Sequence, residues 1–497
     1  MRFVRRFLTW VAAAAVWVAW PALAAAQGWS APGSVWTVSA GQAISAAVPN
    51  APPGTPASWF LVAADTGVMY PLLSETTTPA ILQIPQALPG GHYMLEADVG
   101  AGSLRSVWTG PALVVMPDPA VRGQITGQGM FDPFFVYRHY NMLPVFQEGD
   151  FGQGQTIVLY EASAVLWSDV AQFDALFGLP PVSAATVAPD GPTGIVSGAQ
   201  LEATMDVEWV HAMAPQAHLV LYEAPYTGDA YNHAVRYAAA IGATAFSLSY
   251  YDPNGFRAEG YLTAPVDNLE IEHAAMAGVG LFAAAGDFGL AGTQDRLDWP
   301  AANEYTVAVG GTMINPLGQD VWWQGVPYPW DAGGYGFSDY PMARWQAEEW
   351  TRLGLLGSPL DALVPGLVHR YLPDVSFLAW NAPIIVNGVL QANGGTSLAA
   401  PCWAGIWALA QAHYAQTYGA DLRGAIVPEV LYRVANATGP TPEVLPAFLD
   451  QAFGQPAPFT AQLGFGPPNV ANLVYDVAAV YAPAPSGSAG GGFMVLS

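Results

Sequence analysis

Five short, almost uninterrupted apolar runs lie between residues 155 and 312, and they constrain the fold more than any other feature of the chain. Strands that are apolar on both faces and alternate with helices are typical of a parallel sheet covered by helices on both sides. The sequence therefore predicts an α/β domain with a doubly wound, mostly parallel sheet. The runs are 155–162, 218–224, 244–251, 279–287 and 305–312, and helical patterns occupy 164–177, 199–213, 228–241 and 265–278.

The region before these runs has a different pattern. Residues 27–120 are rich in Pro, Gly, Val, Thr and Ala, and short apolar or alternating segments are separated by turn signals such as Pro89-Gly90-Gly91. Such spacing is typical of a small antiparallel β-sandwich. We therefore expect an all-β domain over 27–120, the α/β domain over 125–482 and a flexible tail over 483–497.

The first 26 residues have the pattern of a secretory signal peptide. Arg2, Arg5 and Arg6 precede an apolar run that ends in three alanines, a small-residue cleavage site. An uncleaved membrane anchor is the alternative, since the run approaches the ~20 apolar residues of a membrane span. The break at Pro21 favours cleavage, with a mature chain that begins near Gln27 and is secreted.

The charge balance restricts the partners and the environment. The 14 basic residues are all Arg, against 38 Asp plus Glu, which gives a formal net charge of −24. Such a charge excludes nucleic acids and anionic membranes as expected partners. In acid many carboxylates become neutral, and a small number of basic groups then limits repulsion within the chain. The composition fits an acidic extracellular environment, although an ordinary acidic secreted protein at neutral pH remains open.

Residues 393–410 join a Gly-Gly-Thr-Ser turn to a helix of small residues. Ser397 in this turn has two interpretations, because serine is a favoured helix cap as well as a nucleophile. The pattern places Pro401 in the first helical turn, where its missing N–H costs nothing. Cys402, the only cysteine, falls on the apolar helix and is predicted to be a core residue.

A serine nucleophile needs a base, and the sequence favours a carboxylate over histidine. None of the eight histidines is followed by glycine, and a histidine with a pKa of ~6.5 is already protonated in acid. Glu202 and Asp206 are one helical turn apart and share a face, beside an apolar stripe. Two such carboxyls share a proton. Two solvated carboxylates on a surface helix are the alternative.

Asp287 follows an apolar strand and lies among glycines, where the carboxyl end of a strand meets a loop. A protonated Asp at this place could donate a hydrogen bond to an oxyanion, and it could do so only below its pKa. A turn-forming Asp is the alternative. Together with Ser397, Glu202 and Asp206, this residue would complete one acid-active site.

The chain resembles the sedolisin family of serine-carboxyl peptidases over roughly residues 125–480. The similar segments are EATMDVEWVHAMAPQAHLVLYEA, AAAGDFG, DWPAANEYTVAVGGT, WDAGGYGFSDYPMARWQ, RYLPDVSFLAW and GGTSLAAPCWAG, in the family's order. The resemblance implies a subtilisin-like fold with Ser397 as nucleophile, Glu202 as general base and Asp206 as its orienting partner. It also implies that Asp287 stabilises the oxyanion, helped by the helix N-terminus at Ser397. Asp374 matches a recurrent family position and is expected to be structural.

The chain departs from the family pattern at two places. Family members usually carry a large N-terminal prodomain, whereas residues 27–120 have the pattern of a β-sandwich. Family members also bind calcium near the C-terminus, and Asp450 matches the first ligand. The later motif ends in Gly466 where the family has an Asp, so one carboxylate ligand is lost and we expect weak calcium binding or none.

These patterns predict a secreted, acid-active serine-carboxyl endopeptidase that needs no cofactor for its chemistry and acts as a monomer on protein or peptide substrates. Two alternatives stay open. One is a tripeptidyl-peptidase-type exopeptidase, which the sizes of the products would reveal. The other is a non-catalytic secreted binding or surface protein that has kept a protease fold.

Overall fold

The structure is a computed structural model of the 497-residue chain. It describes residues 35–48, 51–64, 67–72, 77–100, 106–250, 265–290, 299–315, 318–322, 332–354, 369–422, 424–436, 447–450, 455–456 and 459–483. The predicted signal peptide, and the predicted tail from residue 484 onward, lie outside these ranges. No helix within them is long and apolar enough to cross a membrane.

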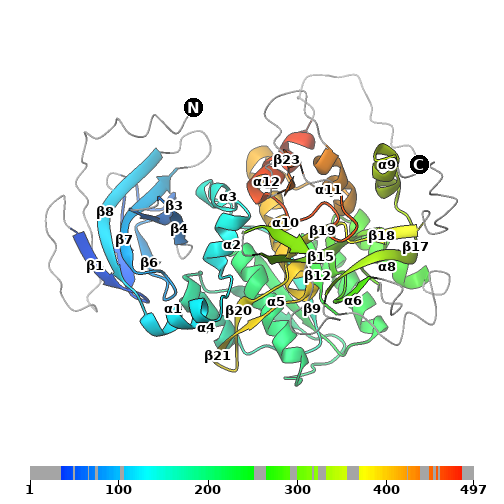
Figure 1. Cartoon of the computed structure of the whole chain (residues 1–497), viewed down its shortest axis with the longest axis horizontal. Coiled ribbons are helices and arrows are strands. Elements are labelled where there is room, and N and C mark those ends of the chain that lie inside the picture. Colours follow the sequence, from blue (N-terminus) through cyan, green and yellow to red (C-terminus); the bar gives the residue numbers. More distant parts are fainter. Residues whose placement is uncertain are drawn as a thin grey trace.

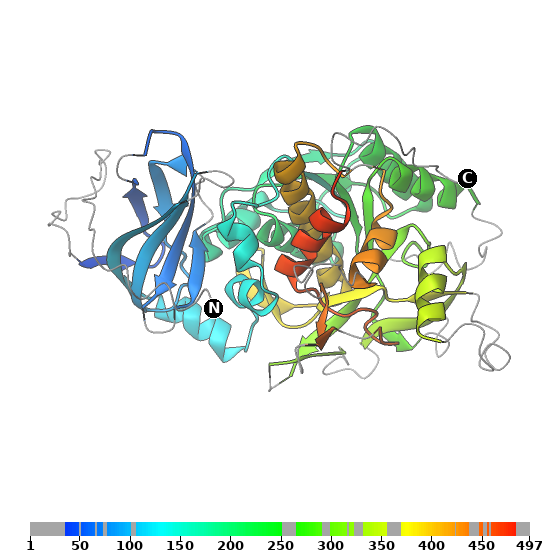
Figure 2. The ribbon, with the colours of Figure 1, turned by 90° about the horizontal axis from the view of Figure 1, so that it is seen from above.

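The N-terminal region contains two sheets, as the turn-rich sequence predicts (Figures 1 and 2). Its core includes Trp59, Phe60, Leu82 and Leu95, all almost fully buried. The larger sheet has the order β1 (Val35–Ser39), β8 (Ser106–Met116), β7 (Gly91–Val99), β3 (Thr55–Ala63) and β4 (Met69–Leu72), with β5 (Thr77–Thr78) paired to β3. The second pairs β2 (Ala43–Ala46) with β6 (Ala80–Gln83).

One strand of this region departs from the predicted antiparallel arrangement. β1 pairs with β8 in parallel, with Val35 opposite Ala112 and Ser39 opposite Met116. Parallel neighbours cannot be joined by a tight turn, so the chain forms all the other strands of this region before it returns to β1. Turn signals identify hairpins but do not reveal such a long-range pairing, and the prediction was wrong for this strand.

The second region is built on the predicted doubly wound sheet. Its order is β10 (Ser183–Val187), β11 (His218–Glu223), β9 (Thr156–Glu161), β12 (Ala245–Leu248), β13 (Gly280–Ala284), β15 (Thr306–Ile314) and β16 (Asp320–Trp322), with β19 (Val375–Leu378) also paired to β15. Each pair is parallel except β15 with β16. The fold class predicted from the apolar runs is confirmed.

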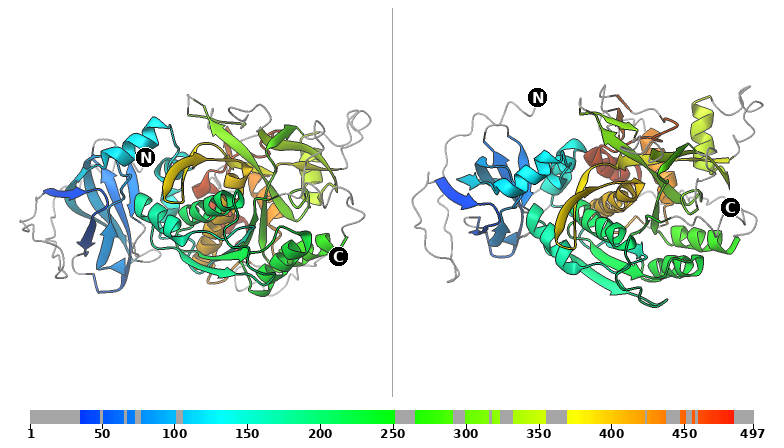
Figure 3. Two further views of the ribbon diagram at one scale, coloured as in Figure 1. Left: turned by 90° about the horizontal axis from the view of Figure 1, so that it is seen from below. Right: turned by 60° about the horizontal axis from the view of Figure 1, so that its bottom comes forward.

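Successive residues of β9 explain why helices cover both faces of the sheet. Ile157 and Leu159 belong to a core shared with α5 (Ala199–Met213) and α10 (Thr396–Tyr418). Val158 and Tyr160 point to the other face, where the core includes residues of α6 (Gly228–Ala240) and α8 (Pro265–Met276). α10 packs on α5 and runs across several strands (Figure 3).

The sequence predicts the bounds of α5 to the residue and those of α6 and α8 to within two residues. It misses β10, because this edge strand, Ser-Ala-Ala-Thr-Val, is partly exposed and has no run of large apolar residues. The remaining helices are α1 (Pro119–Gly127), α2 (Pro133–His139), α3 (Leu143–Gln147), α4 (Trp167–Phe177), α9 (Arg344–Arg352), α11 (Val427–Asn436) and α12 (Val470–Val480). The smaller sheets are β14 (Phe288–Leu290) with β17 (Ala332–Pro341) and β18 (His369–Leu372), β20 (Ala382–Val386) with β21 (Val389–Asn393), and β22 (Leu449–Asp450) with β23 (Gln455–Pro456).

Asp374 has the structural role that was expected of it. Its carboxylate is fully buried and lies 2.6 and 2.5 Å from two guanidinium nitrogens of Arg370. It also accepts hydrogen bonds from the Ala308 N–H and the Tyr432 hydroxyl. These bonds connect β15, β18 and α11, and they leave a paired rather than an isolated buried charge.

Candidate active site

Ser397 is the second residue of α10 and does not cap the helix. The N-cap is Gly395, whose φ of 104° lies in the region that favours glycine, and no side chain caps this end. The capping interpretation of Ser397 is therefore wrong. The predicted position of Pro401 in the first helical turn is also wrong. The helix begins at Thr396, so Pro401 falls in its second turn, inside the helix.

Pro401 has a consequence for the Ser397 carbonyl. A proline has no N–H, so the carbonyl four residues earlier, that of Ser397, loses its helical donor. The Ser249 hydroxyl lies 3.1 Å from this oxygen and takes the place of the missing N–H. In return the Ser397 hydroxyl donates to the Ser249 carbonyl at 3.3 Å. Ser249, just after β12, thereby fixes the turn that carries Ser397.

Glu202 and Asp206 lie on the buried side of α5. Asp206 is fully buried, and its Oδ2 is 2.5 Å from the Ser249 hydroxyl. Glu202 is half-buried; its Oε1 is closed off from solvent, and its carboxyl interacts with the Ser397 hydroxyl. The alternative of two solvated carboxylates on a surface helix is excluded. Within the described part of the chain, no histidine is hydrogen-bonded to Ser397.

A third buried carboxyl, Glu161, joins this group and was missed by the sequence analysis. It ends β9, is fully buried, is close enough to Asp206 for the two carboxyls to influence each other's pKa, and accepts a hydrogen bond from the Tyr250 hydroxyl at 3.1 Å. The available signal was an acidic residue at the end of an apolar run. That signal is ambiguous, because Glu223 ends β11 in register with Glu161 and instead binds the N–H groups of Thr193 and Gly194.

The electrostatics of the three carboxyls follow from their burial. Loss of hydration raises the pKa of Glu202 to about 7, the Ser397 hydrogen bond opposes this rise, and the negative charge of Asp287 adds to it. Burial also raises the pKa of Asp206 and of Glu161, and each is raised further by the neighbouring carboxylates. The group therefore retains protons that exposed carboxyls would have lost.

Asp287 lies at the other side of the Ser397 turn. Its Oδ1 is 2.8 Å from both the backbone nitrogen and the hydroxyl of Thr396, the first residue of α10. The Thr396 hydroxyl in turn accepts the Gly286 N–H at 3.2 Å. Thr396 was not singled out in the sequence analysis, because a threonine beside a serine in a turn carries no distinct signal. The four predicted site residues are thus brought together around the N-terminus of α10.

The space beside Gly395 leads to a prediction about stability. A Cβ at this position would stand 2.9 Å from Asp287 Oδ2, and φ is positive. We expect Gly395→Ala to lower the free energy of unfolding by about 1–3 kcal/mol, measured by urea denaturation. Gly419→Ala is a matched control, because this glycine ends the same helix at positive φ with nothing within 4 Å. Equal losses in the two variants would contradict a steric conflict at Asp287.

The calcium site implied by the resemblance is not supported by the loop that would carry its second carboxylate. Gly466 has no side chain, and its carbonyl accepts the Ser376 N–H at 3.1 Å. The Leu463 carbonyl accepts the Ser376 hydroxyl at 2.9 Å, and the Gly464 carbonyl accepts the Thr460 N–H at 2.8 Å. The side chain of Asp450 lies outside the described part of the chain. The loop offers no carboxylate at Gly466, calcium needs several oxygen ligands, and weak or absent calcium binding stays a prediction.

Comparison with known proteins gives matches to one group of related peptidases. The sequence model of the subtilase family matches residues 192–455. Kumamolisin from Bacillus sp. (strain MN-32) is 30% identical over 304 residues, which are 57% of this chain and 53% of that protein. Sedolisin from Pseudomonas sp. (strain 101) is 33% identical over 141 residues, 26% of this chain and 22% of that protein.

Two matches that cover more of the chain at lower sequence identity agree with these. Human tripeptidyl-peptidase 1 is 26% identical over 362 residues, covering 68% of this chain and 60% of that protein. A solved structure of Pseudomonas sedolisin, a serine-carboxyl proteinase complexed with two molecules of pseudo-iodotyrostatin, has a TM-score of 0.55 at 20% identity. It covers 70% of this chain and 98% of that chain, and it shows a shared fold. The chain spans about half the length of the first curated relatives that it matches.

Proposed function

The chain belongs to the subtilase family and, within it, to the sedolisins, and from that premise we propose that it is an endopeptidase that hydrolyses peptide bonds through an acyl-enzyme on Ser397. The observation that carries the proposal is the row of carboxyls behind the serine, in which Glu202 interacts with the Ser397 hydroxyl and Asp206 with Glu161. A base made of carboxyls suits acid, where histidine would be charged.

In the proposed first step, the Ser397 oxygen attacks the carbonyl carbon of the scissile bond while its proton passes to Glu202. The oxyanion that forms is stabilised by a proton donated from Asp287 in a hydrogen bond and by the positive end of α10. Glu202 then returns the proton to the amide nitrogen, which leaves as an amine and gives a serine ester. Water hydrolyses the ester, with Glu202 again accepting the proton.

The three carboxyls of the row share the proton that Glu202 accepts. When Glu202, Asp206 and Glu161 lose one proton between them, the remaining protons stabilise the single negative charge through hydrogen bonds. Loss of a second proton is opposed by repulsion between buried charges, in line with the raised pKa values. Asp287 donates to the oxyanion only while it is protonated, and we propose that activity is highest in acid.

A direct test distinguishes cleavage of internal peptide bonds from release of tripeptides, because the relatives include both sedolisin and tripeptidyl-peptidase 1. The purified chain is incubated in acid with peptides whose N-termini are either free or acetylated, and the products are sized by mass spectrometry. An endopeptidase cuts both sets at internal bonds. Release of tripeptides from the free peptides alone would establish the exopeptidase, and no cleavage of either set would favour the binding-protein alternative.

We also propose that the chain is exported and works outside the cell without calcium. The Arg-rich start, the apolar run and the alanine ending support cleavage near Gln27, which N-terminal sequencing of the secreted protein checks. The missing carboxylate at Gly466 supports calcium independence. We expect protein dialysed against EDTA to keep its midpoint of thermal unfolding when calcium is added, and a clear rise would contradict this.

A further inference from the structure

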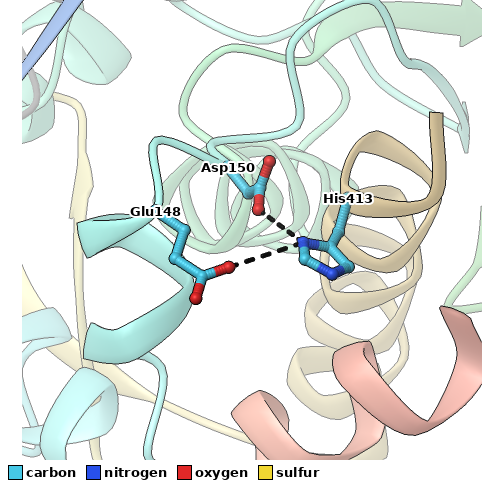
Figure 4. A group of neighbouring side chains, drawn as sticks. All are labelled: Glu148, Asp150 and His413. Carbon is cyan, nitrogen blue, oxygen red and sulfur yellow. Dashed lines mark hydrogen bonds and ion pairs between the residues drawn. The ribbon is translucent and has the colours of Figure 1, made fainter. Parts of the chain in front are cut away.

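Three side chains from two distant parts of the sequence meet at the opposite end of α10 from Ser397. Glu148 follows α3, Asp150 stands two residues later, and His413 lies on α10 (Figure 4). Since α10 rises 1.5 Å per residue, His413 is about 24 Å along the helix axis from Ser397. Gly149, with φ of 83°, makes the turn that brings both carboxylates to the imidazole. The group is therefore separate from the candidate active site.

The donor atoms of these side chains are grouped around one point. His413 Nδ1 lies 2.8 Å from Asp150 Oδ2 and 3.8 Å from Glu148 Oε2, and the three atoms all lie within 4.8 Å of one another. Donors on one tetrahedral zinc ion, each about 2.0–2.1 Å from the metal, are about 3.3 Å apart. The observed separations lie on both sides of this value, so small side-chain rotations would bring the three donors to one metal ion.

The burial and charge of the group point to a cation. Asp150 is fully buried, and its Oδ1 has no hydrogen-bond partner. The ion pairs of Glu148 and Asp150 within the described ranges are both with His413, whose ring packs against Tyr475 of α12 at 5.1 Å. One imidazole cannot balance two carboxylates, and a neutral imidazole balances neither. A divalent cation would remove this excess of negative charge at a buried carboxylate.

We propose that Glu148, Asp150 and His413 bind one divalent transition-metal ion of the Zn²⁺ class. A nitrogen with two carboxylate oxygens suits Zn²⁺, Co²⁺ or Ni²⁺, whereas Ca²⁺ and Mg²⁺ prefer ligand sets made of oxygen alone. Three protein ligands leave a fourth position for water, on the side where Glu148 is 47% exposed. The bound ion would fasten the turn between α3 and β9 to the long helix that carries Ser397.

In the test, the untagged full chain is dialysed against EDTA and then titrated with ZnCl₂ at neutral pH. Calorimetry measures the binding during the titration. We expect one Zn²⁺ per chain, and a rise in the midpoint of thermal unfolding that CaCl₂ does not produce. Glu148→Gln removes one ligand from an accessible side chain, and we expect it to weaken zinc affinity at least about tenfold. His413→Gln should abolish stoichiometric binding.

Glu348→Gln is the matched control, because Glu348 is 68% exposed on α9, where it pairs with Arg344 at 4.0 Å and is not part of the proposed metal site. It should bind zinc as the parent does. If His413→Gln does not fold, Glu148→Gln against Glu348→Gln decides the result. The proposal is overturned if the parent takes up no Zn²⁺ in stoichiometric amount, or if Glu148→Gln binds it as tightly as Glu348→Gln; the group is then an ion pair only.

Discussion

Replacing Ser397 with alanine should lower kcat by at least about four orders of magnitude while leaving the fold intact. The hydroxyl is the only group in the proposed mechanism that forms a bond to the substrate, and loss of a nucleophile leaves only binding and oxyanion stabilisation. The hydrogen bond of this hydroxyl to the Ser249 carbonyl is long, at 3.3 Å, so its removal costs little stability. Hydrolysis of a fluorogenic peptide in acid measures the rate, and thermal unfolding checks the fold.

Variants of the neighbouring carboxyls separate this mechanism from a general loss of structure. Glu202→Gln removes the base and Asp287→Asn the proton donor, and each should lower kcat about 10²–10³-fold or more with little change in KM. Ser168→Ala on α4 is the control, because this serine is exposed and is not one of the residues of the site. If Ser397→Ala digested the peptide as fast as Ser168→Ala, the assignment of the nucleophile would be wrong.

The second large effect is on stability, which should fall as pH rises from acid towards neutrality. Burial raises the pKa values of Glu161, Glu202, Asp206 and Glu208 above their ordinary values. Between the unfolded and the folded pKa, each group is protonated in the folded chain and ionised in the unfolded chain. Unfolding then releases protons, so the free energy of unfolding decreases with pH by up to about 1.4 kcal/mol per pH unit for each group.

The pH range over which this stability is lost follows from the pKa shifts. The contribution is fully present below about pH 4, where the unfolded carboxyls are protonated. For Glu202 it is lost as pH rises to about 7. Urea denaturation at a series of pH values measures the slope. A free energy of unfolding that rises steadily from acid to neutral pH would contradict the raised pKa values.

Glu208→Gln isolates one of these groups without touching the candidate site. Glu208 Oε2 accepts the Ile385 N–H at 3.0 Å, and Oε1 is buried without a partner. The amide imitates the protonated acid, so the hydrogen bond can stay while the titration is removed. We expect the variant to match the parent in acid and to lose stability less steeply with pH, by up to about 1.4 kcal/mol per pH unit.

The sequence predicts the central sheet well because the patterns there are local. A buried parallel strand must be apolar on both faces, so β9 and β11 are visible as runs, and α5 is bounded by Gly198 and Ala214. β10 is invisible because an exposed edge strand needs no such run. The parallel pairing of β1 depends on residues 77 positions further along the chain, which no local pattern encodes. The predicted domain boundaries stay predictions.

In the candidate site, too, local patterns predict some residues and not others. Glu202 and Asp206 could be paired from helical spacing, and Ser397 and Asp287 could be proposed from their turns. Glu161 and Ser249 could not be predicted as site residues, because their proximity to α5 and α10 depends on the order of strands in the sheet. The position of Pro401 was misjudged because α10 begins directly after Gly395, at a positive φ beside Asp287 that the sequence pattern does not reveal.

The central claim is that Ser397 is a nucleophile activated by carboxyls, and covalent labelling tests it most directly. The purified chain is treated in acid with a fluorophosphonate probe, digested and mapped by mass spectrometry. The account predicts one adduct per chain, on Ser397, formed far more slowly in Glu202→Gln and absent in Ser397→Ala. An adduct on another residue, or an unlabelled Ser397 in a preparation that hydrolyses peptides, would contradict it.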